Sequence, residues 1–90
     1  MAVLKKILGY EICLWEIEGN KYKRDRLLLI RKNGFTEIIS IENEIVHEMG
    51  DKISNESVRK AIYDWIMDNH EDLIMECDRA SMLDYHPKHF

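Results

Sequence analysis

Two histidines near the C-terminus have the spacing that comes closest to a metal site. His86 and His89 stand three residues apart with Pro87 between them, and two imidazoles so placed can share a metal ion. A structural zinc site needs four ligands, however, and a catalytic zinc site usually needs three. The remaining His and Cys residues and Asp84 stand at no informative spacing. We therefore expect solvated histidines and no bound metal.

No pairing of a nucleophile with a base is recognisable in the sequence. No Ser, Cys or His stands in a known nucleophile motif, and the four glycines are spread singly, so they form no phosphate-binding loop. His70, Glu71 and Asp72 have the residue types of a general base, but adjacent residues of a helix point in different directions. The sequence predicts a protein that is not an enzyme and uses no cofactor.

A basic segment contains the residue types that contact phosphates and stack on bases. It combines Tyr22 with the cations Lys21, Lys23, Arg24, Arg26, Arg31 and Lys32. One alternative is therefore a small nucleic-acid-binding protein that uses the hairpin region of residues 21–32. The thirteen carboxylates of residues 37–90 oppose this function, so the charge balance disfavours nucleic acid. The same cations can instead protect an edge strand and its turn from aggregation.

The charges of the chain divide into two parts of opposite sign. Residues 1–36 contain eight Lys and Arg and four Asp and Glu, which gives +4, whereas residues 37–90 contain five and thirteen, which gives −8. If the first part is a sheet and the second is helical, the helical side repels nucleic acid and attracts basic protein surfaces. A solvated acidic face would have the same composition.

The length of 90 residues indicates one small domain, with residues 83–90 as a loosely packed tail. Charged residues and Gly9 interrupt the apolar stretch from Val3 to Trp15. We therefore expect no membrane span, no signal peptide and a cytoplasmic protein.

The two cysteines, Cys13 and Cys77, both stand at apolar positions of the pattern. Two cysteines are too few for a disulfide framework. Free buried thiols are expected, and a bridge between the two cysteines is the alternative.

The clearest predicted element is a hairpin around Asn33 and Gly34. These residues separate two apolar segments, residues 27–31 and 35–41, and Asn-Gly favours a type I′ turn because both residues tolerate positive φ. The alternating pattern of residues 7–17 predicts a further strand that is apolar on both faces. Together these strands form a three-stranded antiparallel meander, which needs a helix on one face for stability.

A short helix is predicted after the hairpin. Ile41, Ile45, Val46 and Met49 recur at helical spacing, and Gly50 suits the residue that follows a helix. The alternative is that residues 42–46 prolong the preceding strand.

A long amphipathic helix is predicted over residues 57–80. Its apolar face consists of Val58, Ala61, Ile62, Trp65, Ile66, Leu73, Cys77 and Ala80. Ser54 is the expected N-cap. Asn69 falls near the centre of the apolar face, so either its amide is hydrogen-bonded in the core or the helix breaks there and Asn69 caps a second helix. We favour one helix, and the predicted fold class is α+β: a three-stranded antiparallel meander packed against one long C-terminal helix and a short helix.

A second, narrower apolar stripe lies on the flank of the long helix. Tyr63, Met67, His70 and Ile74 follow one another at intervals of four, three and four residues. We favour the interpretation that other parts of the same domain cover this stripe. The alternative is a ridge that binds a partner, since soluble monomers seldom expose contiguous apolar patches.

Part of the long helix resembles a known family. Val58, Arg59, Trp65 and Ile66, followed by residues 70–73, are similar to the C-terminal helix of a family of small uncharacterised bacterial domains often encoded beside toxin and antitoxin genes. That family also has a histidine-rich strand, whereas residues 10–29 of this chain contain no histidine. The resemblance covers the last helix only. It implies a sheet-plus-helix fold and a bacterial or phage setting, and it transfers no functional residue.

The function that these observations favour is protein binding. We expect a small acidic inhibitor or adaptor that occupies a basic, nucleic-acid-binding surface of a larger partner enzyme, in the manner of phage anti-defence proteins or antitoxins. The carboxylates expected to steer the partner are Glu42, Glu44, Glu48, Asp64, Asp68, Glu71 and Asp72, and the expected anchors are Tyr63, Met67 and Ile74. A homodimer in which the anchors pair with those of a second copy is a further alternative.

Overall fold

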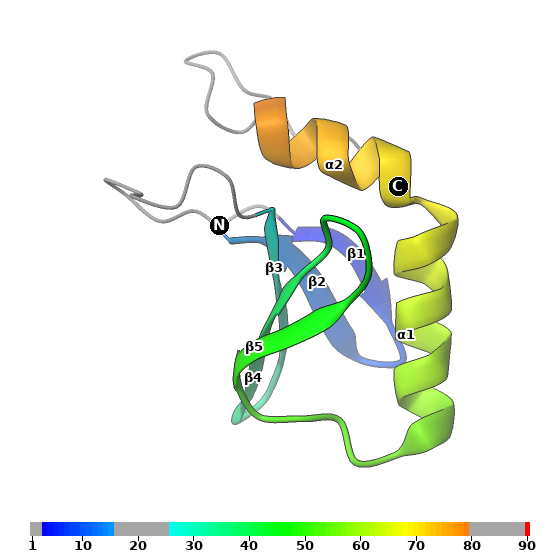
Figure 1. Ribbon diagram of the computed structural model, residues 1–90. Helices are drawn as coiled ribbons and strands as arrows, with labels where there is room; N and C mark the ends of the chain where they lie inside the picture. Colours follow the sequence, from blue (N-terminus) through cyan, green and yellow to red (C-terminus); the bar gives the residue numbers. More distant parts are fainter. Residues whose placement is uncertain (1–2, 16–25, 80–89) are drawn as a thin grey trace.

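The computed structural model describes residues 3–15, 26–79 and 90, and these residues form a five-stranded sheet with two helices (Figure 1). The strands are β1 (Val3–Ile7), β2 (Tyr10–Leu14), β3 (Leu27–Lys32), β4 (Phe35–Ser40) and β5 (Val46–Gly50). Each strand pairs antiparallel with the next along the chain, so the order in the sheet is β1-β2-β3-β4-β5. The predicted α+β class is confirmed, and the predicted number of three strands is wrong.

A tight turn lies inside the predicted strand of residues 7–17, so β2 starts only at Tyr10 and β1 is an additional strand before the turn. Leu8 and Gly9 form this turn, with φ of 51° and 84°, and Ile7 pairs with Tyr10 across it. Positive φ at both central residues is the pattern of a type I′ hairpin turn. Leucine rarely adopts positive φ, so the residue types at these two positions do not predict a turn. Residues 16 and 17 of the predicted strand lie outside the described residues.

The hairpin predicted around Asn33 and Gly34 is confirmed, since β3 and β4 pair along their whole length. Gly34 has a φ of 71°, whereas Leu8 is the only non-glycine residue with positive φ in the described part of the chain. Asn33 therefore has negative φ. A type I′ turn requires positive φ at both residues, so the predicted turn type is wrong.

A bend and a fifth strand replace the predicted short helix. Residues 42–44 form the bend, so the alternative of a strand that continues through them is wrong as well. Ile41 is fully buried, but Val46 and Met49 are 42% and 58% exposed. The apolar residues of this segment therefore do not share one helical face.

Gly50 ends β5 in a conformation that suits glycine, with a φ of 88°. It pairs with Glu37 of β4, and a Cβ at this position would collide with the carbonyl oxygen of Thr36. The next residue, Asp51, donates its N–H to that oxygen over 2.7 Å and accepts the N–H of Thr36 at Oδ2 over 3.0 Å. Close backbone approach, and not a helix end, explains the glycine.

The long predicted helix is two helices, α1 (Glu56–Asp68) and α2 (His70–Arg79), which meet at Asn69. The backbone N–H of Asn69 donates to the carbonyl oxygens of Trp65 and Ile66, and its side-chain Nδ2 donates to the Trp65 oxygen over 2.8 Å. Asn69 thus ends α1, and α2 starts in a new direction (Figure 1). The helix break that we considered as an alternative is correct, and the single helix is wrong.

The N-cap of α1 is Asn55, one residue after the predicted Ser54. Asn55 Oδ1 accepts the backbone N–H groups of Ser57 and Val58 over 3.0 and 3.2 Å. A carbonyl oxygen at this position satisfies donors that the helix leaves unpaired.

One face of the sheet and the two helices form the main core. Its buried members are Leu4, Ile12, Leu14, Leu28, Ile30, Ile39, Ile41, Ile53, Ile62, Ile66 and Leu73. Ile62, Ile66 and Leu73 were predicted on the core face of the helix and are fully buried, whereas Ala61 is exposed. None of the described helices is long and apolar enough to cross a membrane.

A smaller cluster lies on the opposite face of the sheet. Cys13, Leu29 and Ile38 are buried there, and Trp15 and Leu27 pack against them. The prediction that the strand of residues 7–17 is apolar on both faces is thus confirmed for β2, because Cys13 alternates with Ile12 and Leu14 of the main core.

The turn at Leu8 leads to a first prediction. Leu8→Asn should raise the free energy of unfolding by about 0.5–1 kcal/mol, because Asn adopts positive φ at lower cost and the Leu8 side chain is 61% exposed. Urea denaturation measures the change. Leu8→Ala is the control, since alanine lacks the polar side chain that lets Asn adopt positive φ at lower cost. An equal gain from Leu8→Ala would show that backbone conformation is not the cause.

The end of β5 leads to a second prediction. Gly50→Ala should lower the free energy of unfolding by about 1–3 kcal/mol, because it combines positive φ with a contact to the Thr36 oxygen that forces the backbone to shift. Gly34→Ala is the matched control, because Gly34 also has positive φ but a Cβ added there would meet no neighbouring atom within 4 Å. Thermal or urea denaturation should rank Gly50→Ala as clearly the more destabilising, and equal losses would contradict the steric argument.

Candidate functional site

The bend of residues 42–44 is attached to α2 at both ends of that helix. His70, the first residue of α2, forms a hydrogen bond from Nε2 to the carbonyl oxygen of Ile41. Arg26 connects the bend to the other end, since its guanidinium contacts Glu42 Oε1 over 3.4 Å and the carboxylate of Asp78 over 3.1 and 3.3 Å. These contacts place the bend beside the junction of α1 and α2.

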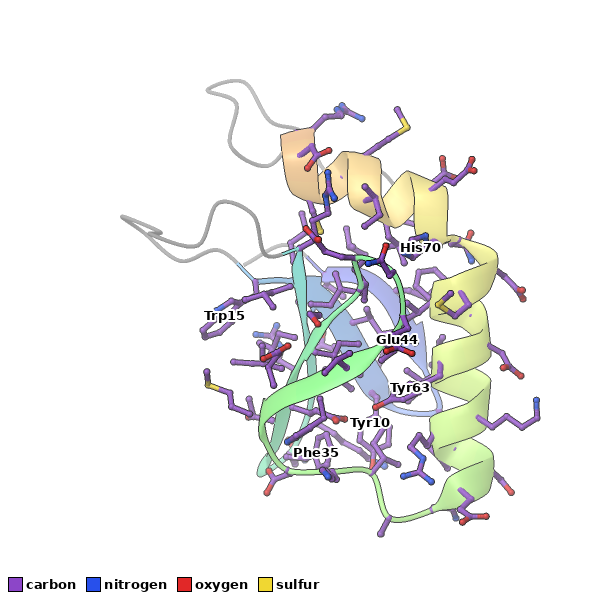
Figure 2. All side chains as sticks on the ribbon, viewed as in Figure 1. Tyr10, Trp15, Phe35, Glu44, Tyr63 and His70 are labelled. Atoms are coloured by element: carbon purple, nitrogen blue, oxygen red, sulfur yellow. The ribbon has the colours of Figure 1, made fainter. Side chains whose placement is uncertain are left out.

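Exposed carboxylates occur in both segments, the bend and the α1–α2 junction. We call this group the acidic surface, and it consists of Glu42, Glu44, Asp68, Glu71 and Asp72, all of them exposed. In the view of Figure 2, Glu44 lies between Tyr63 and His70. Within the described part of the chain, Glu44, Asp68 and Glu71 have no ion pair. Five of the seven carboxylates that the sequence suggested thus lie either in the bend or at the α1–α2 junction.

The other two predicted carboxylates lie elsewhere. Asp64 is on the exposed side of α1, one turn before Asp68, and pairs with Lys60 over 2.7 Å. Glu48 is exposed in β5, at the point where the pairing of β5 with β4 is interrupted by a bulge.

The predicted anchors do not form one exposed ridge. Tyr63 and Ile74 are half-buried and pack against the main core. The His70 ring is hydrogen-bonded to the carbonyl oxygen of Ile41. Met67 is 44% exposed. The domain itself covers most of this stripe, so Met67 is the anchor that a partner can reach most easily.

A buried polar cluster connects β4, β5 and α1, and it was not among the predicted sites. Glu37 of β4 is 1% exposed. Its Oε2 is 2.7 Å from His47 Nδ1 and accepts a hydrogen bond from the Tyr63 hydroxyl over 3.4 Å, while its buried Oε1 has no hydrogen-bond partner among the described residues. Burial, and then the nearby Glu37 carboxylate, raise the pKa of Tyr63.

The alternation of β4 contains the signal for this cluster. Phe35, Glu37, Ile39 and Ile41 are spaced by two residues and therefore face the same side, so a glutamate among core positions needed a buried partner. Among the described residues, no group of three or more His, Cys, Asp or Glu side chains could hold a metal ion.

The cations of the predicted nucleic-acid segment do not all lie within the described residues, and those that do are in different surroundings. Arg26 is engaged with Glu42 and Asp78, and Arg31 and Lys32 lie near the β3–β4 turn. Lys21, Tyr22, Lys23 and Arg24 lie outside the described residues, as do His86 and His89 of the predicted tail.

Both cysteines are free, as expected; Cys13 is buried, whereas Cys77 is half-buried. Cys13 belongs to the cluster on the far face of the sheet, and Cys77 packs against the main core. Burial raises the pKa of both thiols above the usual value of 9.0, and that of Cys77 rises to about 12.

Comparison of the chain with protein-family models, with curated proteins and with solved structures found no significant match. The site therefore has to be interpreted from its own geometry.

The buried thiols lead to a third prediction. The unfolded chain releases the Cys77 proton near pH 9, whereas the folded protein retains it to a pH of about 12. The protonated thiol thus stabilises the fold below pH 9, and this contribution is lost progressively as the pH rises from 9 towards 12.

Urea denaturation at several pH values above 9 should therefore show a steeper fall in stability for the wild type than for Cys77→Ala. A native thiol that reacts with a disulfide reagent at pH 8 as fast as the unfolded chain would contradict burial as the cause. Cys13→Ala serves as the comparison variant, since its thiol lies on the other face of the sheet.

Proposed function

We propose that this protein is a small acidic binding module whose acidic surface docks onto a basic, nucleic-acid-binding surface of a larger partner protein. The observation that carries the proposal is that exposed carboxylates occur both in the 42–44 bend and at the α1–α2 junction, which the hydrogen bond between His70 and Ile41 connects, and that three of them have no ion pair in the described part of the chain. Occupation of such a surface would inhibit the partner or recruit it elsewhere.

The charge distribution supports a role for these carboxylates in steering a partner. Residues 37–79 contain twelve Asp and Glu against four Lys and Arg, which gives −8, while the described residues before position 37 contain one against five, which gives +4. A charged surface of one sign accelerates encounter with a surface of the opposite sign and orients it, and salt weakens both effects.

The apolar part of the proposed interface is small. Met67 is the exposed member of the predicted anchors, since Tyr63 and Ile74 pack inward. An interface with few apolar contacts depends on charge complementarity, so we expect binding that is fast and sensitive to salt. A homodimer through the same surface is less well supported, because two copies would bring like charges together.

Charge reversal tests this proposal and is our fourth prediction. The double variant Asp68→Lys with Glu71→Lys should capture much less of its basic partners from a lysate of the native host at low salt, because two of the unpaired carboxylates are replaced by cations. Quantitative mass spectrometry of the captured proteins measures the loss. The wild type should lose the same proteins when the salt concentration is raised.

Glu48→Lys is the control for this experiment. Glu48 is also exposed and has no ion pair in the described part of the chain, but it lies in β5 outside the acidic surface. Capture should therefore be nearly unchanged. The proposal would be wrong if the double variant captured the same proteins in the same amounts, or if Glu48→Lys reduced capture as strongly.

A further inference from the structure

Four side chains align across the sheet on the face opposite the helices. Lys6 of β1 pairs with Glu11 of β2, Glu11 pairs with Arg31 of β3, and Arg31 pairs with Thr36 of β4. Paired residues of neighbouring strands lie on the same face. This face therefore carries a polar row near the end of the sheet where β1 turns into β2 and β3 turns into β4.

A hollow of about 490 Å³ lies at this end of the sheet, between the polar row and the two turns. Its lining consists of Lys6, Gly9, Glu11, Arg31, Lys32, Asn33, Gly34, Phe35 and Thr36. Three of these side chains are cations and one is a carboxylate, so the lining carries a net charge of +2. Two of the lining residues are glycines of the two turns, and the backbone is accessible there.

The cations of the hollow are held in place by their neighbours. Arg31 donates from Nε to Glu11 Oε1 over 2.9 Å, which orients the guanidinium, and no described acceptor bonds its terminal nitrogens. Lys32 Nζ lies 4.9 Å from the centre of the Tyr10 ring. The Lys32 chain passes over Gly9, because a Cβ on Gly9 would lie 3.3 Å from Lys32 Cε.

Two aromatic rings that pack against the main core, on the helix side of the sheet, hold Lys32 at this end of the sheet. Tyr10 and Phe35 meet edge to face, with 5.2 Å between ring centres and an angle of 85°. Figure 2 shows both at the end of the sheet away from Trp15 and His70. A cation over an aromatic face is restrained without being neutralised, so Lys32 keeps its donors for another group.

The carboxylates close to the hollow are already engaged. Glu11 bonds Arg31, and Asp51 accepts the backbone N–H of Thr36 beside the hollow. The hollow thus combines two free guanidinium amino groups and two lysines around a space large enough for a small ligand. Planar and tetrahedral oxyanions are the groups that such donors bind best.

We propose that this hollow binds the phosphate group of a nucleotide or of a nucleic-acid backbone. The terminal nitrogens of Arg31 donate to two phosphate oxygens, and Lys6 and Lys32 neutralise the remaining charge. This site shares no residue with the acidic surface, so it is independent of the proposed function.

Titration of the full-length protein with pyrophosphate at low salt, followed by NMR, tests the proposal. The amide resonances of residues 6–11 and 31–36 should shift and saturate. Arg31→Gln and Lys32→Gln should each weaken binding about tenfold, the effect expected from loss of a hydrogen bond to a charged group. Glu11→Gln should strengthen binding, because it keeps an acceptor for Arg31 Nε and removes the negative charge.

Lys60→Gln is the matched control, since it removes one cation that does not line the hollow. Its affinity for pyrophosphate should equal that of the wild type. Absence of a saturable shift in these amides, or equal weakening by Lys60→Gln, would overturn the proposal. Thermal unfolding of each variant confirms that it is folded. If Arg31→Gln does not fold, Lys32→Gln still tests the proposal.

Two ligands distinguish the source of the phosphate. Adenosine triphosphate and a single-stranded oligonucleotide should both compete with pyrophosphate. Tighter binding of the oligonucleotide, with a steep dependence on salt, identifies a nucleic-acid backbone. Equal or tighter binding of the nucleotide identifies a small ligand. Failure of both to compete would contradict the proposal and would leave the acidic surface unaffected.

Discussion

The packing of two short helices on one face of the sheet is the interaction on which the rest of the structure depends. α1 has thirteen residues and α2 has ten, and isolated helices of this length are marginal in water. Their stability has to come from Ile62, Ile66 and Leu73, which are fully buried against the sheet, at roughly 1.5–3 kcal/mol for each side chain. The break at Asn69 is a consequence, because it lets both helices turn their apolar residues to the same curved face.

The sequence predicts the parts of the fold that depend on neighbouring residues. It does not predict the parts that depend on contacts between distant residues. The hairpin at Asn33 and the amphipathic faces of the helices follow from neighbouring residues, and both are recovered. The turn at Leu8 is not, because it has an unfavourable residue that only the pairing of β1 with β2 can hold in place. Gly50 is also determined by a distant contact, with Thr36 of β4, so a helix end and a strand end were indistinguishable.

The candidate site shows the same division. The acidic residues are evident from composition, but the attachment of the 42–44 bend to α2 depends on the hydrogen bond of His70 to Ile41 and on the contacts of Arg26 with Glu42 and Asp78, which no local pattern encodes. Glu37 is the clearest example of a residue that was not among the predicted site residues. Burial of its carboxylate is costly, and its contacts with His47 and Tyr63 connect β4, β5 and α1. A one-residue slip of β5 would move His47 to the other face, so we infer that this cluster fixes the register of β5.

The order of the strands explains why the two proposed sites are separate. In a meander, neighbours in sequence are neighbours in space, so the basic residues of β1 and β3 gather at one end of the sheet while the acidic residues that follow β4 gather at the helices. The edge strands offer little for a partner to pair with, because bulges interrupt both β1 and β5. The two proposed sites therefore consist of side chains on the surface, and the separation of charge matches each of them to a ligand of opposite sign.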